Sequence, residues 1–361
     1  ACASINGALT KPGFVISDTI LVATGIYTGT GDEVVLIDKS VTLSGGWNAG
    51  FVTQSGTSIV DGQHSRRGVT VNADITALVE RFEIQNGSNS GIYNHYNGNL
   101  TLNNSIVSNN SGSWCGGIRN SGTLTLNDSI VSNNFAPDGG GGGVCNYDES
   151  LTINNSTISN NAVAIGGGGV FNSGSGTVTL NNSTIRNNFA GERGGGVQNM
   201  GTLTFNSSTV SNNTTMLKGG GVMNYGSLTL NSSSISNNTA LWEGGGTFRA
   251  GGEVVLNNSI LSDNIASSSP NCYGTISSFG YNLIGDTADC TFTPSAGVLA
   301  DVNAQLGALV GSPGYHPLLS TSPAIDAGNP AGCTDHLGNP LITDQRGAPR
   351  VGRCDIGAYE Y

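Results

Sequence analysis

A short motif repeats along the middle of this chain and constrains its fold more than any other feature. Seven segments resemble LTLNNSIVSNN and follow one another at intervals of 24 to 27 residues. A second motif, GGVxN, lies between them and recurs from residue 116 to residue 224. Repeats of this length are typical of solenoids, in which each unit buries its apolar side against its neighbours. The seven segments end at Asn110, Asn134, Asn161, Asn188, Asn213, Asn238 and Asn264.

The apolar residues within each repeat alternate with polar ones. Leu100, Leu102 and Val107 are separated by polar neighbours, and the same pattern returns at Leu228, Leu230 and Ile235. A period of two predicts strands with one buried face. The density of Gly, Asn, Ser and Thr argues against helix, because these are poor residues for a helix interior. Each repeat is therefore expected to hold about three short strands.

Three strands in about 25 residues favour a right-handed parallel β-helix, because a propeller blade needs four strands and about 40 residues. Stacked turns about 4.8 Å apart would place equivalent residues in columns. The sequence predicts an Asn ladder at a bend, with Asn in left-handed conformation, and positive φ at glycines such as Gly166 to Gly169. The ladder comprises Asn103, Asn127, Asn154, Asn181, Asn206, Asn231 and Asn257. The interior stack comprises Leu102, Leu126, Ile153, Leu180, Phe205, Leu230 and Leu256.

The chain divides into three regions by the regularity of its repeats. Residues 1–90 indicate irregular turns of the same helix, and residues 91–264 hold the seven regular repeats. Residues 265–361 break the pattern and are rich in Pro and Cys. We expect this last region to supply the final turns and a loop-rich cap over the open end of the helix, with a short helical turn at 301–309.

Charge and hydropathy exclude two classes of partner. The 13 basic residues are scattered and the net charge is −11, so a nucleic-acid partner is not expected. No run of about 18 apolar residues exists, so we expect no membrane span. The acidic balance also disfavours a polyanionic substrate, unless a local basic patch or bound calcium reverses the field.

The seven cysteines indicate an oxidising compartment. Cys272 with Cys290, and Cys333 with Cys354, would each close a short loop, and each disulfide would add about 3 kcal/mol of stability. Two such bridges predict an exported protein, whereas the alternative is buried free thiols. Cys115 and Cys145 are four positions apart in repeat register, roughly 13 Å along a strand, which is too far for a bridge without local distortion. Cys2, Cys115 and Cys145 are left unassigned.

The GGVxN and SNN alternation resembles the repeats of polymorphic outer-membrane proteins and related bacterial β-helix proteins of the pectate-lyase-like superfamily. The tail GYNLIGDTADC (280–290) with SPAIDAGNPAGC and DQRGAPRVGRCDIGAYEY (322–361) is similar to the choice-of-anchor domain of secreted bacterial proteins. The resemblance implies a right-handed parallel β-helix, bacterial secretion or surface display, and a chain whose anchor has been removed. It carries no catalytic residue across.

Catalytic groupings are sought because the superfamily includes polysaccharide lyases and hydrolases. The acidic residues of the repeats share no column, as calcium-dependent lyase chemistry would need. No pair of neighbouring Asp residues, Gly-His-Gly or GxSxG occurs. We therefore expect no catalytic residues.

The loops between SNN and GGG differ from repeat to repeat and are the candidate glycan-binding edge. Two turns would separate Asp138 from Glu192, about 10 Å, and this lies just beyond the spacing of inverting glycosidase carboxylates. An edge of aromatic and charged residues suits a sugar chain, whereas the alternative is a solvated loop edge. The candidate residues are Asp138, Glu192, Arg193, Lys218, Trp242 and Glu243.

No cofactor is expected, but calcium is left open by the aspartates of the tail. The competing interpretation is an Arg–Asp network that fixes the tail, and this interpretation is preferred. The residues concerned are Asp326, Asp335, Asp344, Asp355, Arg346, Arg350 and Arg353.

The sequence thus favours a structural or adhesive protein of the bacterial surface or exterior, without catalytic activity. Its partners would be cell-surface polysaccharide or copies of itself. The alternative is a carbohydrate-active enzyme, a polysaccharide lyase or glycoside hydrolase, acting at the loop edge.

Overall fold

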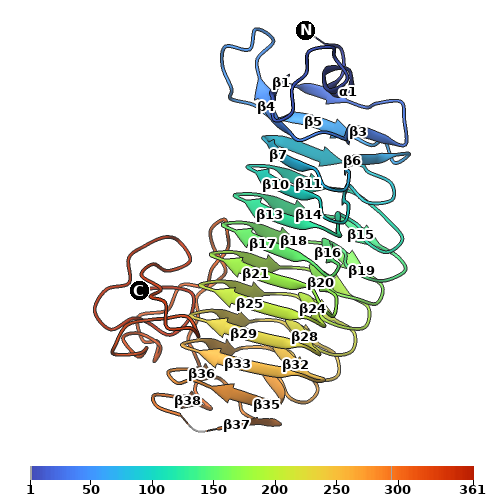
Figure 1. The fold of residues 1–361 in the computed structure, drawn as a ribbon. Helices are drawn as coiled ribbons and strands as arrows, with labels where there is room; N and C mark the ends of the chain where they lie inside the picture. The colour runs from blue at the N-terminus through green and yellow to red at the C-terminus, as the bar shows by residue number, and fades with distance from the viewer. Residues whose placement is uncertain (1, 294) are drawn as a thin grey trace.

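Short strands with alternating burial form most of the chain and stack into an elongated parallel β-helix (Figure 1). The structure, a computed structural model, describes residues 2–293 and 295–361. One helix, α1 (Ile5–Leu9), begins after Ser4, whose hydroxyl accepts a hydrogen bond from Gly7 N, an N-cap arrangement. The buried Ile5 and Leu9 of α1 pack at the N-terminal end of the core. The all-β fold predicted from the repeats is confirmed.

The GGVxN motif forms the first column of parallel strands, ladder I. Each strand pairs in register with the equivalent strand of the next turn. Ladder I consists of β3 (Glu33–Ile37), β6 (Arg67–Val71), β9 (Ile92–Asn94), β12 (Ile118–Asn120), β16 (Val144–Asn146), β20 (Val170–Asn172), β24 (Val197–Asn199), β28 (Val222–Asn224), β32 (Thr247–Arg249) and β35 (Cys272–Ser278).

The LTLN motif forms ladder II, which also ends on β35, since this strand pairs with both β32 and β33. Its other strands are β1 (Thr19–Ala23), β4 (Val41–Trp47), β7 (Thr76–Glu80), β10 (Asn99–Asn103), β13 (Thr123–Asn127), β17 (Ser150–Asn154), β21 (Thr177–Asn181), β25 (Thr202–Asn206), β29 (Ser227–Asn231) and β33 (Glu253–Asn257).

The SxIS motif forms ladder III, with one strand from each successive turn. Its strands are β2 (Gly25–Tyr27), β5 (Ser58–Asp61), β8 (Phe82–Gln85), β11 (Ile106–Ser108), β14 (Ile130–Ser132), β18 (Thr157–Ser159), β22 (Thr184–Arg186), β26 (Thr209–Ser211), β30 (Ser234–Ser236), β34 (Ile260–Ser262), β36 (Leu283–Ile284) and β38 (Leu299–Ala300).

A fourth column of two-residue strands, ladder IV, was not expected from the sequence. It lies in the loops between SNN and GGG, where the apolar pattern is too short to reveal a strand. Ladder IV consists of β15 (Phe135–Ala136), β19 (Ala162–Val163), β23 (Phe189–Ala190), β27 (Thr214–Thr215) and β31 (Thr239–Ala240). The remaining strand, β37 (Cys290–Phe292), pairs with β35 in the last turn.

The predicted interior stack is the core of the helix. Every member from Leu102 to Leu256 is at most 1% exposed. The predicted Asn ladder is confirmed from Asn103 to Asn231, since each Nδ2 donates to the Oδ1 of the preceding turn at 2.8 to 2.9 Å. Asn257 leaves the ladder and donates instead to Thr334 O at 2.7 Å.

Two further Asn ladders are present that the sequence analysis did not recognise. One joins the closing residues of the repeats from Asn110 to Asn264 and continues to Asn271. The other joins the last residues of GGVxN from Asn94 to Asn224. Both ladders are buried, so their amides satisfy one another away from water.

Two expectations about backbone conformation were wrong. The left-handed residue is not the ladder Asn but the residue after it, as at Asn104 and Asn155, each with φ of 47°. Gly166 to Gly169 do not adopt positive φ. They are required for close approach instead, because a Cβ on Gly166 would collide with Gly140 O of the neighbouring turn.

Three disulfides join Cys272 to Cys290, Cys333 to Cys354 and Cys115 to Cys145. The first two were predicted, whereas the third joins cysteines that the strand register places too far apart for a bridge without local distortion. A straight strand would keep these cysteines apart, but the chain turns between Gly141 and Cys145, where Gly141 N donates to Cys145 Sγ at 3.1 Å. The turn brings the Cα atoms of Cys115 and Cys145 to 5.8 Å. Cys2 is exposed and unbonded.

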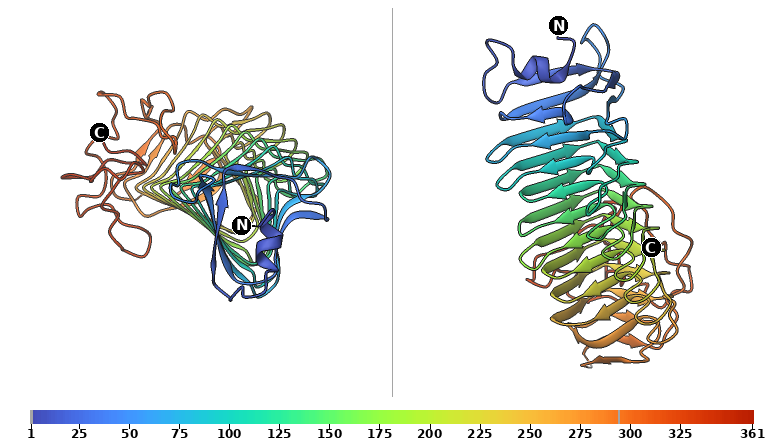
Figure 2. Two further views of the ribbon diagram at one scale, coloured as in Figure 1. Left: turned by 90° about the horizontal axis from the view of Figure 1, so that it is seen from above. Right: turned by 90° about the vertical axis from the view of Figure 1, so that its right-hand side faces the viewer.

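Residues 301–361, which we call the tail, do not cover the end of the helix as expected. They lie along its side, beside β21 to β33, while β37 and β38 form the lower end in Figure 1. Seen along the axis in Figure 2, the tail projects to one side of the turns. The expected helical turn at 301–309 is absent; these residues are extended or irregular.

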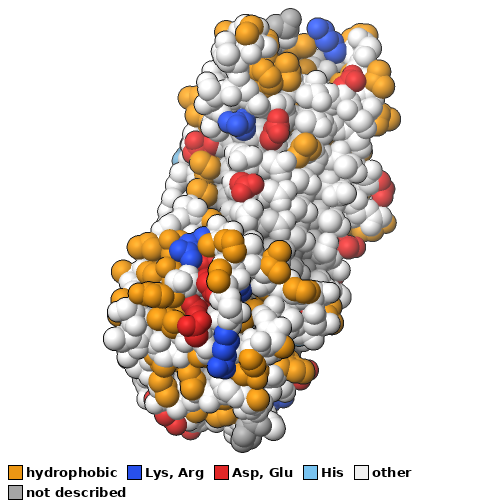
Figure 3. Space-filling view, turned by 90° about the vertical axis from the view of Figure 1, so that its left-hand side faces the viewer, with side chains coloured by type: hydrophobic (Ala, Val, Ile, Leu, Met, Phe, Trp, Pro, Cys, Tyr) orange, Lys and Arg blue, Asp and Glu red, His pale blue; other side chains and the backbone are white. Residues whose placement is uncertain are grey.

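The tail is attached to ladder III by buried polar and apolar contacts. Gln345 accepts from Thr209 Oγ1 at 2.6 Å and donates to Thr184 Oγ1 at 2.8 Å. Ile260 and Leu283 pack with apolar residues of the tail, among them Ile356. Figure 3 shows the tail over the lower part of this face and a mostly polar surface of the turns above it.

Candidate ligand-binding face

The structure brings most of the predicted loop-edge residues into one row. Arg193, Lys218 and Glu243 occupy equivalent positions on consecutive turns and form β-bridges with one another. Lys218 Nζ lies 2.7 Å from Glu243, and Arg193 Nε lies 3.8 Å from Glu192. These two ion pairs leave the edge balanced in charge.

Asp138 and Trp242 do not join this group closely. Asp138 is exposed, and Trp242 is 58% exposed on the loop beside Glu243. Neither lines the adjoining hollow of about 340 Å³, to which Glu192, Arg193 and Lys218 contribute. The other residues of the hollow are Leu217, Met223, Tyr225, Phe248 and Ala250.

The hollow connects the loop edge to a column of residues that the sequence analysis missed. This column is the variable position of GGVxN, whose side chains lie on the side of the strand opposite the buried Val and Asn. Tyr93 and Phe171 are half-buried, and Arg119 and Tyr273 are exposed. The other four side chains, Cys145, Gln198, Met223 and Phe248, are at most 6% exposed. The column could have been found by comparing the variable positions, which are mainly aromatic, sulfur-containing or cationic. The outer column consists of Tyr93, Arg119, Cys145, Phe171, Gln198, Met223, Phe248 and Tyr273.

Aromatic contacts follow the outer column over several turns. Phe248 and Tyr273 stack with ring centres 4.4 Å apart and planes 2° apart. Lys218 Nζ lies 4.6 Å from the centre of the Phe248 ring, a cation–π contact. The ring centres of Phe171 and of Tyr147, which follows β16 directly, lie 6.0 Å apart. The loop edge and the outer column therefore form one continuous face.

The Cys115–Cys145 disulfide lies within this face. Cys115 Sγ is 3.5 Å from the hydroxyl of Tyr147, and Cys145 Sγ is 3.5 Å from Trp114 O. Trp114 is 52% exposed at the loop edge. The bridge thus fixes the loop that carries Trp114 against the turn that carries Tyr147.

The upper part of the face is cationic. Arg67 and Arg119 both lie over the ring of Tyr93. Burial, and then the charges of Arg67 and Arg119, lower the pKa of His95 below its ordinary value of 6.5, so this side chain is neutral at pH 7. Burial raises the pKa of the Tyr147 hydroxyl.

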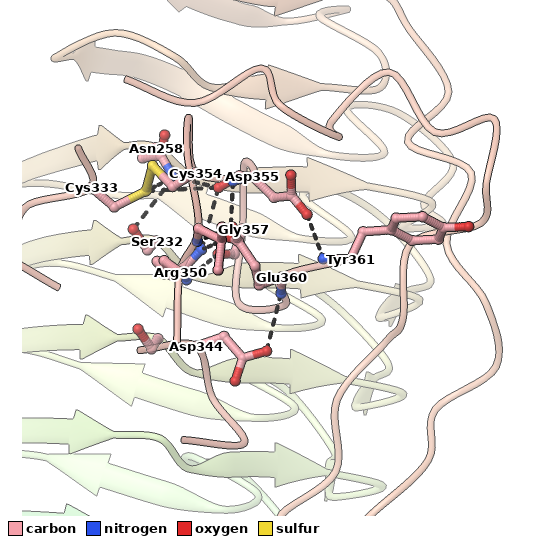
Figure 4. A network of polar contacts seen from close by, with 12 residues as sticks. Ser232, Asn258, Cys333, Asp344, Arg350, Cys354, Asp355, Gly357, Glu360 and Tyr361 are labelled. Carbon is pink, nitrogen blue, oxygen red and sulfur yellow. Dashed lines mark hydrogen bonds and ion pairs between the residues drawn. A yellow bond between two sulfur atoms is a disulfide. The ribbon is translucent and has the colours of Figure 1, made fainter. Parts of the chain in front are cut away.

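The tail holds a separate, structural network of charges (Figure 4). Arg350 pairs with Glu360 at 3.2 Å, and its side chain is 3% exposed. Arg346 pairs with Asp344 at 2.7 Å. Asp355 accepts from Tyr361 N at 2.6 Å, and burial raises the pKa of its carboxyl group. The preferred interpretation of an Arg–Asp network is therefore supported, although Glu360 was not foreseen.

The other charged residues predicted for the tail have local roles. Asp335 accepts from Leu337 N and Asn339 N within its own loop. Arg353 Nε donates to Gly328 O at 2.6 Å, and Asp326 N donates to Asp355. Across residues 2–293 and 295–361, no three His, Cys, Asp or Glu side chains are grouped so that they could hold a metal ion.

Comparisons with known proteins do not assign a function to this face. No model of a known protein family matches the chain, and no curated protein matches its sequence. Within the described residues, no helix is long and apolar enough to cross a membrane. The three disulfides indicate a non-reducing, extracellular type of environment.

Proposed function

We propose that this protein is a non-catalytic, carbohydrate-binding β-helix protein that acts outside the cell. The glycan lies across the turns, along the outer column and the loop edge. The observation that carries the proposal is the stacked pair of Phe248 and Tyr273 in register, of which Tyr273 is 39% exposed, together with the exposed side chains of Trp114 and Trp242. Aromatic rings with a few placed polar or charged groups are the usual lining of a ligand-binding site.

The loop edge supports binding rather than bond cleavage. A hydrolase or lyase needs an acid and a base free to exchange protons with the substrate. Glu243 is held by Lys218, and Glu192 faces Arg193. These pairs fit a site that recognises hydroxyl groups without reacting with them.

The cell-surface part of the proposal rests on the disulfides and on the sequence resemblance to secreted bacterial β-helix proteins. A regular solenoid displayed on a surface presents the same row of side chains over a long distance, which suits an adhesive role. The ligand would then be a polysaccharide of the same or another cell surface.

A panel of polysaccharides tests the proposal by affinity electrophoresis and by assays for reducing ends and unsaturated uronides, with and without calcium. We expect retardation by at least one polysaccharide and no turnover. Tyr273→Ala and Trp242→Ala should each weaken binding about threefold to tenfold. The control Tyr361→Ala changes a tyrosine of the tail that is 64% exposed and should leave binding unchanged. Turnover that is lost in Glu192→Ala would instead establish an enzyme.

A further inference from the structure

Two arginines and two tyrosines alternate over four successive turns at the upper part of the face. Arg67 and Arg119 lie on β6 and β12, on opposite sides of β9, which carries Tyr93. The guanidinium carbons lie 5.1 Å and 4.9 Å from the centre of the Tyr93 ring. Arg119 also lies 5.6 Å from the ring of Tyr147. We call these four residues the Arg–Tyr row.

The arginines of this row are not neutralised by the protein. Arg119 is exposed, and within the described residues it forms neither an ion pair nor a side-chain hydrogen bond. Arg67 donates to Asn89 O at 3.1 Å and to Thr70 Oγ1 at 3.3 Å. Glu33 is the carboxylate whose charge acts on Arg67, and it is itself bonded to Thr70. Glu33 thus partly offsets the charge of Arg67, whereas Arg119 has no ion pair within the described residues.

The surroundings make this local excess of positive charge unusual. The whole chain carries a net charge of −11, so most of its surface repels anions. Burial lowers the pKa of Arg67, Glu33 and Tyr93 raise it, and the charge of Arg119, the smallest contribution, lowers it. An anion placed between the two groups would relieve their repulsion. Arg67 already donates to Asn89 and Thr70, whereas the N–H groups of Arg119 have no partner within the described residues and can donate to an anion.

We propose that the Arg–Tyr row binds the carboxylate or sulfate groups of an acidic polysaccharide. The inference rests on the proposed glycan-binding function and adds the charge of the ligand. Arg119 contacts the anionic group directly because its side chain is exposed. Arg67 is half-buried; it contributes positive charge and holds the ring of Tyr93 in place. A polysaccharide fits better than a nucleic acid, since two arginines in an acidic protein offer few phosphate contacts.

Isothermal titration with three oligosaccharides of one backbone tests the inference: a uronic-acid form, its carboxyl-reduced neutral form and a sulfated form. We expect the acidic forms to bind more tightly than the neutral one. Arg119→Gln should weaken acidic binding about tenfold and weaken neutral binding far less, so that the preference for the acidic forms is lost. The control Arg186→Gln alters a cation on ladder III and should have no effect. Because Arg119 is exposed, far-UV circular dichroism of its variant should match the parent.

The outcomes separate this inference from the proposed function. Equal binding of acidic and neutral forms, unchanged in Arg119→Gln, would overturn the anionic site and leave glycan binding intact. Binding of none of the three, and of no member of the polysaccharide panel, would overturn both. Tight binding of a single-stranded oligonucleotide that is lost in Arg119→Gln would overturn the choice of a polysaccharide.

Discussion

The regular turns at residues 91–264 and the tail at residues 301–361 are stabilised in different ways. Each regular turn is held by contacts to an almost identical turn about 25 residues away, through three Asn ladders and a continuous apolar core. The tail contains no sequence repeat. It is held by buried ion pairs, one disulfide and contacts to turns more than 100 residues earlier, such as Gln345 with Thr209.

This difference bears on where the proposed ligand face can lie. A repeated turn can vary only where its side chain points outward, and the outer column varies there from Tyr93 to Tyr273. The tail covers ladder III, on another side of the turns, and leaves ladder I free. The candidate ligand face therefore lies mainly on the regular turns, with Arg67 and Tyr273 on the turns next to them.

The largest loss of stability is expected when a side chain of the apolar stack is truncated. Phe205→Ala removes a side chain that is 1% exposed and should lower the free energy of unfolding by about 3–5 kcal/mol. Urea unfolding followed by far-UV circular dichroism measures this loss. The control Phe189→Ala, at a side chain 41% exposed, should change stability by less than about 1 kcal/mol. Equal effects at both positions would show that the stack does not dominate.

A smaller loss of stability is expected when a residue of the buried ladder from Asn110 to Asn271 is replaced. Asn188 donates to Asn213 and Ile158 O and accepts from Asn161. Asn188→Ala leaves these buried groups without partners and should cost roughly 1–3 kcal/mol. The exposed Asn99→Ala on β10 should cost little. A neutral result for Asn188→Ala in the same urea titration would contradict a stabilising role for the ladders.

The tail, unlike the turns, should loosen in acid. His316 is 5% exposed and shares a 2.8 Å hydrogen bond with Ser211, while its Nδ1 bonds Gly307 O. Burial lowers the pKa of His316 below 6.5, against the opposing hydrogen bond to Gly307 and the charge of Asp263. The undocked tail then binds more protons, so docking is stable at neutral pH and weakens as pH falls below about 6.5.

Hydrogen exchange at pH 7.5 and pH 5 measures this loosening. We expect residues 301–361 to lose protection at pH 5, while the regular turns do not. His316→Gln should remove the part of the pH dependence that His316 contributes. Protection in the tail that is identical at both pH values in the parent protein would refute this role.

The smallest effect is expected at the loop edge. Lys218 and Glu243 are about one-third exposed, and such ion pairs contribute about 0–1 kcal/mol. Lys218→Met should therefore leave the melting temperature almost unchanged, since its role is in the ligand face. A large loss of stability, measured by calorimetry, would make the pair structural instead.

The sequence predicted the turns far better than the tail, for a physical reason. The stack from Leu102 to Leu256 and the first Asn ladder follow from residues that recur at one spacing. The Cys115–Cys145 bridge depends on a bend at Gly141 to Cys145, which a strand-based distance does not represent. The position of the tail depends on contacts such as Thr209 with Gln345, and no local pattern encodes these.

The candidate site was predicted only in part for a similar reason. The differences between the loops of successive repeats indicated Arg193, Lys218 and Glu243, which the structure places in a row. The outer column lay in the variable position of a motif that was recognised for its constant residues. Its importance appears only when the turns are stacked and Tyr93 meets Arg67 and Arg119 from neighbouring strands.

Hydroxyl-radical footprinting in the presence of an acidic oligosaccharide tests the central claim, that ladder I and its loop edge form the ligand face. The account predicts protection of Tyr93, Trp114 and Tyr147, with no change at Tyr361 of the tail or Ile130 on ladder III. Protection confined to the tail or to ladder III, with Tyr93 and Trp114 still reactive, would contradict the account.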